Sequence, residues 1–239
     1  MKFRLAPSKK INPSDQYLAR MMMNVMLQPL KHPDQSVLVS VFTPCELMQE
    51  AGLYPYNVES FSCYLTASSA ERAFLQSAED SGLSETLCSY HKTFIGAAEK
   101  GLLPKPKCIV YTNLACDANL LTFQRLAEFF MCRYFQLMCR PVRRRNVAYV
   151  AAQLRALRGF LEQTTGHQID EDKLVQRVKR GYKTLQQFDA FQSARADRFI
   201  PSDLVSPLYS GMTNNILLGT EEEALYTEKL LRGRKESTA

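Results

Sequence analysis

Up to about residue 142, short apolar runs alternate with stretches of helical periodicity. Continuous apolar and β-branched runs predict buried strands over 36–42, 53–58, 107–112 and 134–139. Helices are expected over 14–27, 43–51, 88–99 and 117–130, with a loop and a short helix within 60–86. Pro29 and Pro33 are expected to end the first helix. This alternation predicts an α/β fold, a parallel sheet flanked by helices.

After Arg145 the pattern becomes helical. Amphipathic periodicity predicts helices over 146–163, from about 170 to 188, and over 221–231, with a loop around Pro201 and Pro207. We therefore expect a helical segment to follow the sheet. The domains predicted are 1–142, an α/β parallel-sheet domain with a cysteine site, and 143–239, a helical linking segment.

The composition limits the class of protein. The chain has 239 residues, 46% hydrophobic and 23% charged, as in soluble globular proteins. No apolar run approaches the roughly 18 residues that span a bilayer, and the basic N-terminus is not followed by the apolar region of a secretion signal. The seven scattered cysteines then predict reduced thiols and a cytoplasmic protein.

The net charge of +6 suits a polyanionic ligand such as a nucleotide or coenzyme A. The dense basic cluster 143–145 is short, and no aromatic-interleaved basic stripe accompanies it, so nucleic-acid binding is disfavoured. No Gly-rich phosphate loop, nucleophile elbow or Cys-x-x-Cys motif occurs.

Candidate chemistry lies where predicted strands or loops give way to helices. Pro44-Cys45-Glu46, Cys88 and Cys116-Asp117 all stand at such places. Parallel sheets form their sites beyond the carboxyl ends of their strands. A helix amino end favours the metal-binding thiolate. Each residue alone has a plainer explanation, because a cysteine can be a small buried hydrophobe and a first-turn glutamate a partner of the helix dipole.

Taken together and in order, these segments indicate a particular family more strongly than any one residue does. Residues 42–55 look like the pattern Pro-x-Glu-Leu/Ile-x-x-Ala-Gly-x-x-Pro, and Cys88-Ser89-Tyr90 with Gly96 and Cys116-Asp117 follow in order. Together with the helical stretch 146–174, they resemble the 2-hydroxyacyl-CoA dehydratase D-component family, which includes subunits of 2-hydroxyglutaryl-CoA dehydratase and benzoyl-CoA reductase. The resemblance extends over about 34–200.

The resemblance implies a mechanism. In that family an acyl-CoA binds beside a [4Fe-4S] cluster held by three cysteines in each subunit. An ATP-dependent activator protein delivers one electron, and the thioester becomes a ketyl radical that loses water; the reductase branch reduces an aromatic ring instead. By resemblance, Cys88 and Cys116 are cluster ligands, and Glu46 is a candidate for substrate contact or proton handling. The chain is then part of an iron–sulfur lyase of anaerobic metabolism.

The resemblance also implies partners: an acyl-CoA substrate, a second dehydratase subunit and the activator, in a homo- or hetero-oligomer without nucleic acid or membrane. The family's subunits are longer, with a second α/β domain that supplies the third cysteine. We expect this chain to lack that domain, as a truncated chain, a split gene product or a paralogue. Cys45 is a weaker candidate for the third ligand. The alternative function is a metal-free, non-catalytic paralogue acting as a structural partner subunit.

Overall fold

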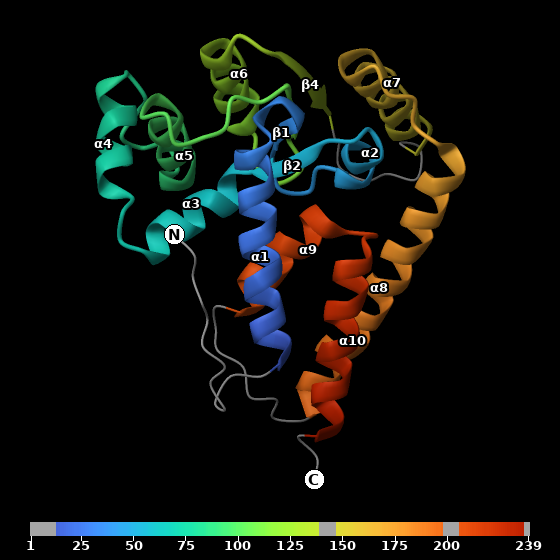
Figure 1. Cartoon of the computed structure of the whole chain (residues 1–239). Helices are drawn as coiled ribbons and strands as arrows, with labels where there is room; N and C mark the ends of the chain where they lie inside the picture. The colour runs from blue at the N-terminus through green and yellow to red at the C-terminus, as the bar shows by residue number, and fades with distance from the viewer. Residues whose placement is uncertain (1–12, 139–146, 198–205, 237–239) are drawn as a thin grey trace. The chain divides into compact units, whose positions relative to one another are not determined.

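The computed structural model describes residues 13–138, 147–197 and 206–236 (Figure 1). The chain forms two compact units, one of Met26–Ile169 and one of Met1–Val25 together with Asp170–Ala239. The domain boundary predicted between residues 142 and 143 lies outside the described residues and stays a prediction.

The first unit contains a four-stranded parallel sheet, which confirms the predicted fold class. Its strands are β1 (Ser36–Val39), β2 (Tyr54–Asn57), β3 (Cys108–Thr112) and β4 (Arg133–Leu137), in the order β2-β1-β3-β4. In the register, Val37 lies opposite both Pro55 and Cys108, and Cys108 lies opposite Arg133. Every residue of β1 and β3 is buried, as their continuous apolar runs require.

Helices cover both faces of this sheet. The helical elements are η1 (Pro33–Gln35), α2 (Cys45–Glu50), α3 (Val58–Ala67), α4 (Arg72–Asp80), α5 (Ser89–Glu99), α6 (Asn119–Phe130) and α7 (Val147–Thr165). In Figure 1, α5 and α6 lie to one side of the sheet and α2 and α7 to the other. Leu38, Ile109 and Tyr111 of the strands pack with Phe94 of α5 and Phe123 of α6 in one buried cluster.

Two local details differ from the sequence prediction. The strand predicted over 36–42 ends at Val39, because the chain turns there and the Thr43 N–H bonds the Ser40 carbonyl at 3.3 Å. The helix predicted over 43–51 begins two residues later than expected, with Pro44 at the cap position and Cys45 as the first residue of α2. Gly52 follows the end of this helix, and its φ of 75° favours glycine.

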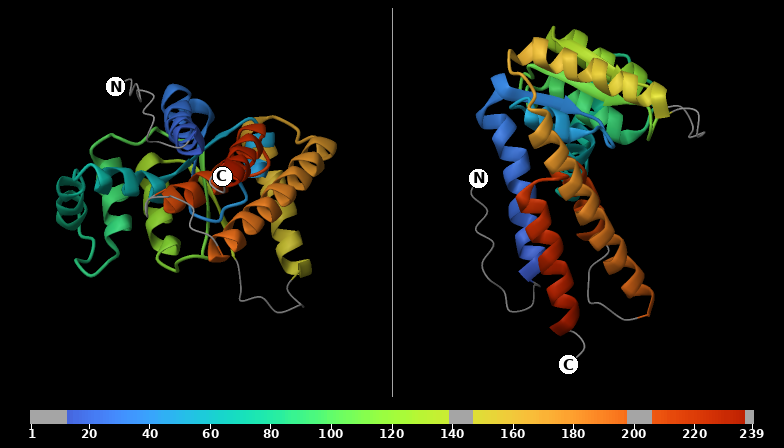
Figure 2. Two further views of the ribbon diagram at one scale, coloured as in Figure 1. Left: turned by 90° about the horizontal axis from the view of Figure 1, so that it is seen from below. Right: turned by 90° about the vertical axis from the view of Figure 1, so that its right-hand side faces the viewer.

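The second unit is helical. It contains most of α1 (Pro13–Lys31), together with α8 (Glu171–Asp197), α9 (Ser206–Leu217) and α10 (Glu221–Glu236), shown from two further directions in Figure 2. Leu18 and Met21 of α1 pack with Tyr226 of α10. None of the helices in the described ranges is long and apolar enough to cross a membrane.

Two proline-based predictions were wrong. Pro29 lies inside α1, which ends at Lys31; a proline this close to the carboxyl end removes a single donor from the helix. Pro207 lies in the first turn of α9 rather than in a loop, where its fixed φ and missing N–H are tolerated.

Candidate functional site

The order of the strands identifies one edge of the sheet as the place for a site. The chain leaves β1 toward β2 and leaves β3 toward β4, in opposite directions, although β1 and β3 are neighbours. In open parallel sheets, ligands bind beyond the carboxyl ends of the strands at such a switch point. We call the turns that follow β1, β2 and β3, residues 40–46, 57–60 and 112–119, the carboxyl-edge turns.

Ser40 ties two of these turns together. Its Oγ accepts a hydrogen bond of 2.9 Å from the Thr112 N–H and lies 3.1 Å from the Thr43 Oγ1. Beyond β3, the Leu114 N–H bonds the Thr112 Oγ1 at 3.1 Å, and the Asn119 Nδ2 bonds the Thr112 carbonyl at 2.8 Å. The switch point is therefore a connected hydrogen-bond network rather than two independent loops.

Glu59, in the first turn of α3, is the buried carboxyl of this edge. It is 8% exposed, and its Oε2 accepts a hydrogen bond of 2.7 Å from the Val41 N–H. Burial raises the pKa of Glu59 to about 7, although hydrogen bonds from the Val41 and Glu59 backbone and from the Asn119 side chain oppose the rise. Asn57 positions the helix, because its side chain caps α3 by accepting a 2.7 Å bond from the Ser60 N–H.

Polar atoms around Glu59 are buried without partners. Within the described part of the chain, the Asn57 Nδ2, the Ser60 Oγ and the Asn119 Oδ1 have no hydrogen-bond partner. A buried polar atom left unpaired costs about 1–3 kcal/mol. Asn57 and Ser60 flank Glu59 in sequence, and Asn119 interacts with it. One donor, one acceptor and one hydroxyl without partners thus belong to residues that are close to Glu59 in sequence or interact with it.

The two predicted cluster cysteines stand at the starts of neighbouring helices. Cys88 is the N-cap residue of α5 and is exposed, and Cys116 is half-buried in the turn before α6. One turn into α5, the His91 Nδ1 lies 2.8 Å from the Thr122 Oγ1 of α6. Because the Thr122 hydroxyl donates to the Ala118 carbonyl at 2.9 Å, it accepts from His91, which fixes the proton of His91 on Nδ1.

The other described cysteines suit a cluster less well. Burial raises the pKa of the Cys45 and Cys63 thiols, and it raises those of Cys108 to about 12 and Cys132 to about 11. Cys45 is fully buried, and its role as a third ligand stays a prediction. Among the described residues, no three His, Cys, Asp or Glu side chains form a metal-binding group, and Cys139 lies outside them. Among the described cysteines, Cys88 is exposed and Cys116 is half-buried, and their assignment as cluster ligands stays a prediction.

Glu46 and Glu59 compare directly as candidates for proton handling. Glu46 lies half-buried in the first turn of α2, at the same edge. Glu59, which the sequence analysis did not single out, is the carboxyl whose hydrogen bonds join α3 to the turn after β1. A signal for it was present in the sequence: Asn57 ends an apolar run and stands two residues before Glu59, the pattern of a capped helix start at a strand end.

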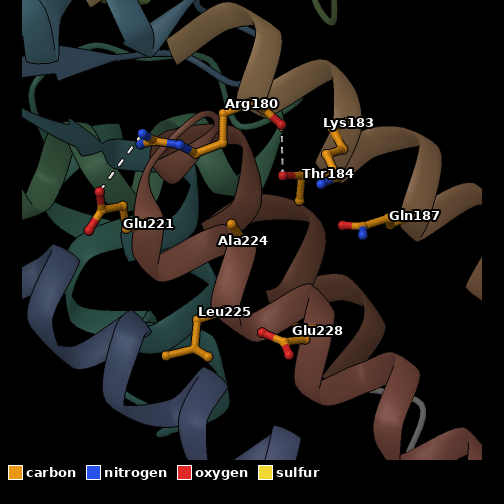
Figure 3. Close-up of a pocket in the computed structure, with 8 residues that line it drawn as sticks. All are labelled: Arg180, Lys183, Thr184, Gln187, Glu221, Ala224, Leu225 and Glu228. Atoms are coloured by element: carbon orange, nitrogen blue, oxygen red, sulfur yellow. Dashed lines mark hydrogen bonds and ion pairs between the residues drawn. The ribbon is translucent and has the colours of Figure 1, made fainter. Parts of the chain in front are cut away.

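The helical unit contains a separate pocket, between α8 and α10 (Figure 3). Its volume is about 540 Å³. Its lining residues are Arg180, Lys183, Thr184, Gln187, Glu221, Ala224, Leu225 and Glu228. Arg180 donates to the Gly219 carbonyl at 3.1 Å and lies 3.8 Å from Glu221. The lining balances two cationic side chains with two acidic ones and holds no histidine or cysteine, so it offers neither a polyanion site nor a metal site.

The comparison with known families agrees with the sequence motifs. The sequence model of the 2-hydroxyglutaryl-CoA dehydratase D-component family matches residues 40–239. The matched region contains the carboxyl-edge turns as well as Cys88 and α8 to α10. No match was found among curated proteins. The resemblance inferred from the sequence is confirmed, and because the match spans far more than half of the chain, this protein belongs to the 2-hydroxyglutaryl-CoA dehydratase D-component family.

Proposed function

We propose that this chain is a subunit of an iron–sulfur 2-hydroxyacyl-CoA dehydratase and that the acyl thioester binds at the carboxyl-edge turns and loses water there. The observation that carries the proposal is the buried Glu59 carboxyl, with a pKa of about 7, among unpaired polar atoms at the switch point. Family membership supports the reaction class. A related ring reductase is the other branch of the same chemistry.

Glu59 is proposed to move the protons of the elimination. Loss of water from a 2-hydroxyacyl group breaks the C2–O bond and a C3–H bond, so one proton must be accepted and the leaving hydroxyl must be protonated. A carboxyl whose pKa is close to the working pH can do both. The Val41 N–H fixes one oxygen of Glu59 at 2.7 Å, which holds the side chain at the edge.

The unpaired atoms beside Glu59 are proposed to orient the substrate. The Asn57 Nδ2 can donate to a carbonyl oxygen, the Asn119 Oδ1 can accept from a hydroxyl, and the Ser60 Oγ can do either. A thioester carbonyl and a 2-hydroxyl group present the complementary acceptor and donor. Glu46, in the first turn of α2, remains a second candidate for substrate contact.

We further propose that Cys88 and Cys116 hold a [4Fe-4S] cluster. Both thiols are accessible and stand at the starts of helices that the His91–Thr122 hydrogen bond links. When bound, the cluster would supply single electrons of low potential to the substrate. The remaining ligand would come from outside the described part of this chain.

Membership in a component family implies a partner subunit in a dehydratase complex. We propose that the partner is a second dehydratase subunit and that an ATP-dependent activator protein delivers the electron. The mild positive charge of the chain suits an acyl-CoA, which carries several phosphate charges.

Metal analysis of oxygen-free protein tests the proposed function. The wild-type chain should carry iron and acid-labile sulfide and absorb broadly near ~400 nm, as expected for thiolate-ligated iron. Cys88→Ser and Cys116→Ser should each lose most of the iron. Cys132→Ser is the matched control: Cys132 is also half-exposed, but it precedes β4 at the opposite edge of the sheet, and its loss should leave the iron content unchanged.

A metal-free structural subunit is the alternative function, and one observation favours it: the described residues contain no three-ligand group. This alternative predicts no iron in any variant and no change in secondary structure or stability beyond that of a surface substitution when Cys88 is replaced. Iron that survives both cysteine substitutions would contradict the assignment of these two ligands.

A further inference from the structure

We propose that α8 binds a helix of another protein along an exposed apolar line, and that this partner helix carries an acidic side chain between two basic ends. The line, called the heptad stripe below, consists of Val175, Val178, Tyr182 and Leu185. None of these residues belongs to the carboxyl-edge turns, so the inference goes beyond the proposed function and does not depend on it.

The four side chains of the heptad stripe are exposed although they are apolar. The exposed fractions are 43% for Val175, 50% for Val178, 65% for Tyr182 and 46% for Leu185. Spacings of three, four and three residues keep them within a band of about 80° on a helix that turns by about 100° per residue. The stripe extends over about 15 Å, or three turns. An exposed apolar line with this spacing is the surface that a second helix covers in a coiled coil.

The contacts of α8 within the helical unit use a different face. Gly181 lies close to the residues that follow α9, because a Cβ added to it would be 3.1 Å from the Leu218 Cγ. Thr184 and Phe191 are buried on the same side of the helix as Gly181. The pocket toward α10 is also lined by residues of α8 that lie outside the heptad stripe (Figure 3). The stripe is therefore a second apolar surface on a helix whose packed face is already occupied.

Charged residues mark the ends and the middle of the heptad stripe. Glu171 stands four residues before the stripe and Asp189 four residues after it, so both continue its line, and Lys179 flanks its middle. All three side chains are exposed. In coiled coils, charges on and beside the apolar line select the partner. A complementary helix therefore has basic residues near Glu171 and Asp189 and an acidic residue near Lys179.

The same charges disfavour a second copy of this chain as the partner. In an antiparallel pair centred on the stripe, Glu171 of one copy would face Asp189 of the other, and the two Lys179 side chains would be adjacent. In a parallel pair in register, each acidic end would face its own counterpart. Both arrangements bring like charges together, which interfaces avoid. The complementary pattern reads the same in either direction, so it specifies the charges of the partner helix but not its orientation.

Peptide binding to the full-length chain tests the inference. The probes are two helical peptides that share one apolar heptad line. The first has lysine at both ends of the line and glutamate beside its middle, and the second has these charges reversed. In fluorescence anisotropy the first peptide should bind about tenfold more tightly, because three charge contacts change sign between the two. The triple variant Glu171→Lys, Lys179→Glu, Asp189→Lys should reverse the preference.

One substitution at two positions tests the apolar contact. Val178→Lys places a charge within the heptad stripe and should weaken the binding of the first peptide about tenfold, as expected when one buried valine side chain is lost. Leu225→Lys is the matched control, because Leu225 is 42% exposed on α10 and lines the pocket, which uses a different face of α8. Its affinity for the peptide should be that of the wild type. Circular dichroism of each variant verifies that it is folded.

The outcomes are distinct. Failure of both peptides to bind, equal binding of both by the wild type, or a preference that the triple variant leaves unchanged overturns the proposed partner chemistry. Wild-type affinity in Val178→Lys overturns the heptad stripe as the contact. Self-association of the chain that Val178→Lys abolishes in sedimentation would identify a second copy as the occupant and overturn the proposal. Iron content and acyl-CoA binding decide the proposed function separately, since these variants leave the carboxyl-edge turns intact.

Discussion

Glu59→Gln should change how the stability of the protein depends on pH. The folded-state pKa of Glu59 is about 7, against an ordinary value of 4.5, because the side chain is buried. The folded chain therefore holds a proton on this carboxyl that the unfolded chain releases above about pH 4.5. Between these two values the folded state binds more protons, so Glu59 makes the protein less stable as the pH rises.

The size of the effect follows from the shift. Each pKa unit corresponds to 1.36 kcal/mol, so raising the pKa from 4.5 to about 7 corresponds to about 3 kcal/mol of stability lost above pH 7. Glutamine keeps an oxygen that can accept the 2.7 Å hydrogen bond from the Val41 N–H, but it carries no charge at any pH. Relative to wild type, Glu59→Gln should gain about 2.5 kcal/mol between pH 5 and pH 8, because part of the loss has already occurred at pH 5.

Urea unfolding followed by circular dichroism at pH 5, 6, 7 and 8 measures this difference directly. All other titrating groups are common to both proteins and cancel in the comparison. Glu128→Gln, which removes a carboxylate from an exposed position on α6, controls for the loss of one charge. Parallel pH profiles for wild type and Glu59→Gln would refute the idea that this carboxyl is held protonated by burial. Catalytic activity should fall at every pH in the same variant.

Two structural predictions concern the packing of α5. In Gly96→Ala, the new Cβ would lie 2.0 Å from the Phe74 carbonyl oxygen of α4, so α4 and α5 must separate. The free energy of unfolding, measured by heat or urea, should fall by about 3 kcal/mol. In the control Gly159→Ala on α7, the new Cβ has nothing within 4 Å, and the free energy of unfolding should rise by about 0.5–1 kcal/mol. Lys92→Met leaves the half-buried Glu79 without its 2.6 Å partner and should destabilise by about 3 kcal/mol, most of which the added change Glu79→Leu should restore.

The fold could be predicted from the sequence because its signals are local. Continuous apolar runs identified all four strands to within a few residues. The signal is strongest for β1 and β3, which are buried at every position, whereas the edge strand β4 is partly exposed. The errors came where tertiary context decides. Pro29 ends no helix, because its position in the last turn costs one hydrogen bond, and Pro207 begins a helix rather than interrupting one.

The candidate site was only partly predictable. The sequence shows which residues follow a predicted strand, and this placed Glu46 and Cys116 at the carboxyl edge of the sheet. How deeply a side chain is buried and which groups it hydrogen-bonds depend on residues that are distant in the sequence. The burial of Glu59 depends on the turn after β1 and on Asn119 of α6, which is 60 positions away in the chain. The order β2-β1-β3-β4, which brings these turns together, follows from long-range pairing that no local pattern specifies.

Several unfavourable features gather at this one edge, and a ligand would relieve them together. The Asn57 Nδ2, Ser60 Oγ and Asn119 Oδ1 are buried without partners in the described chain, at about 1–3 kcal/mol each. A thioester with a hydroxyl beside its carbonyl could pair these polar atoms. We therefore expect acyl-CoA binding to stabilise this unit more than free coenzyme A does, because the coenzyme alone lacks the groups that satisfy the edge.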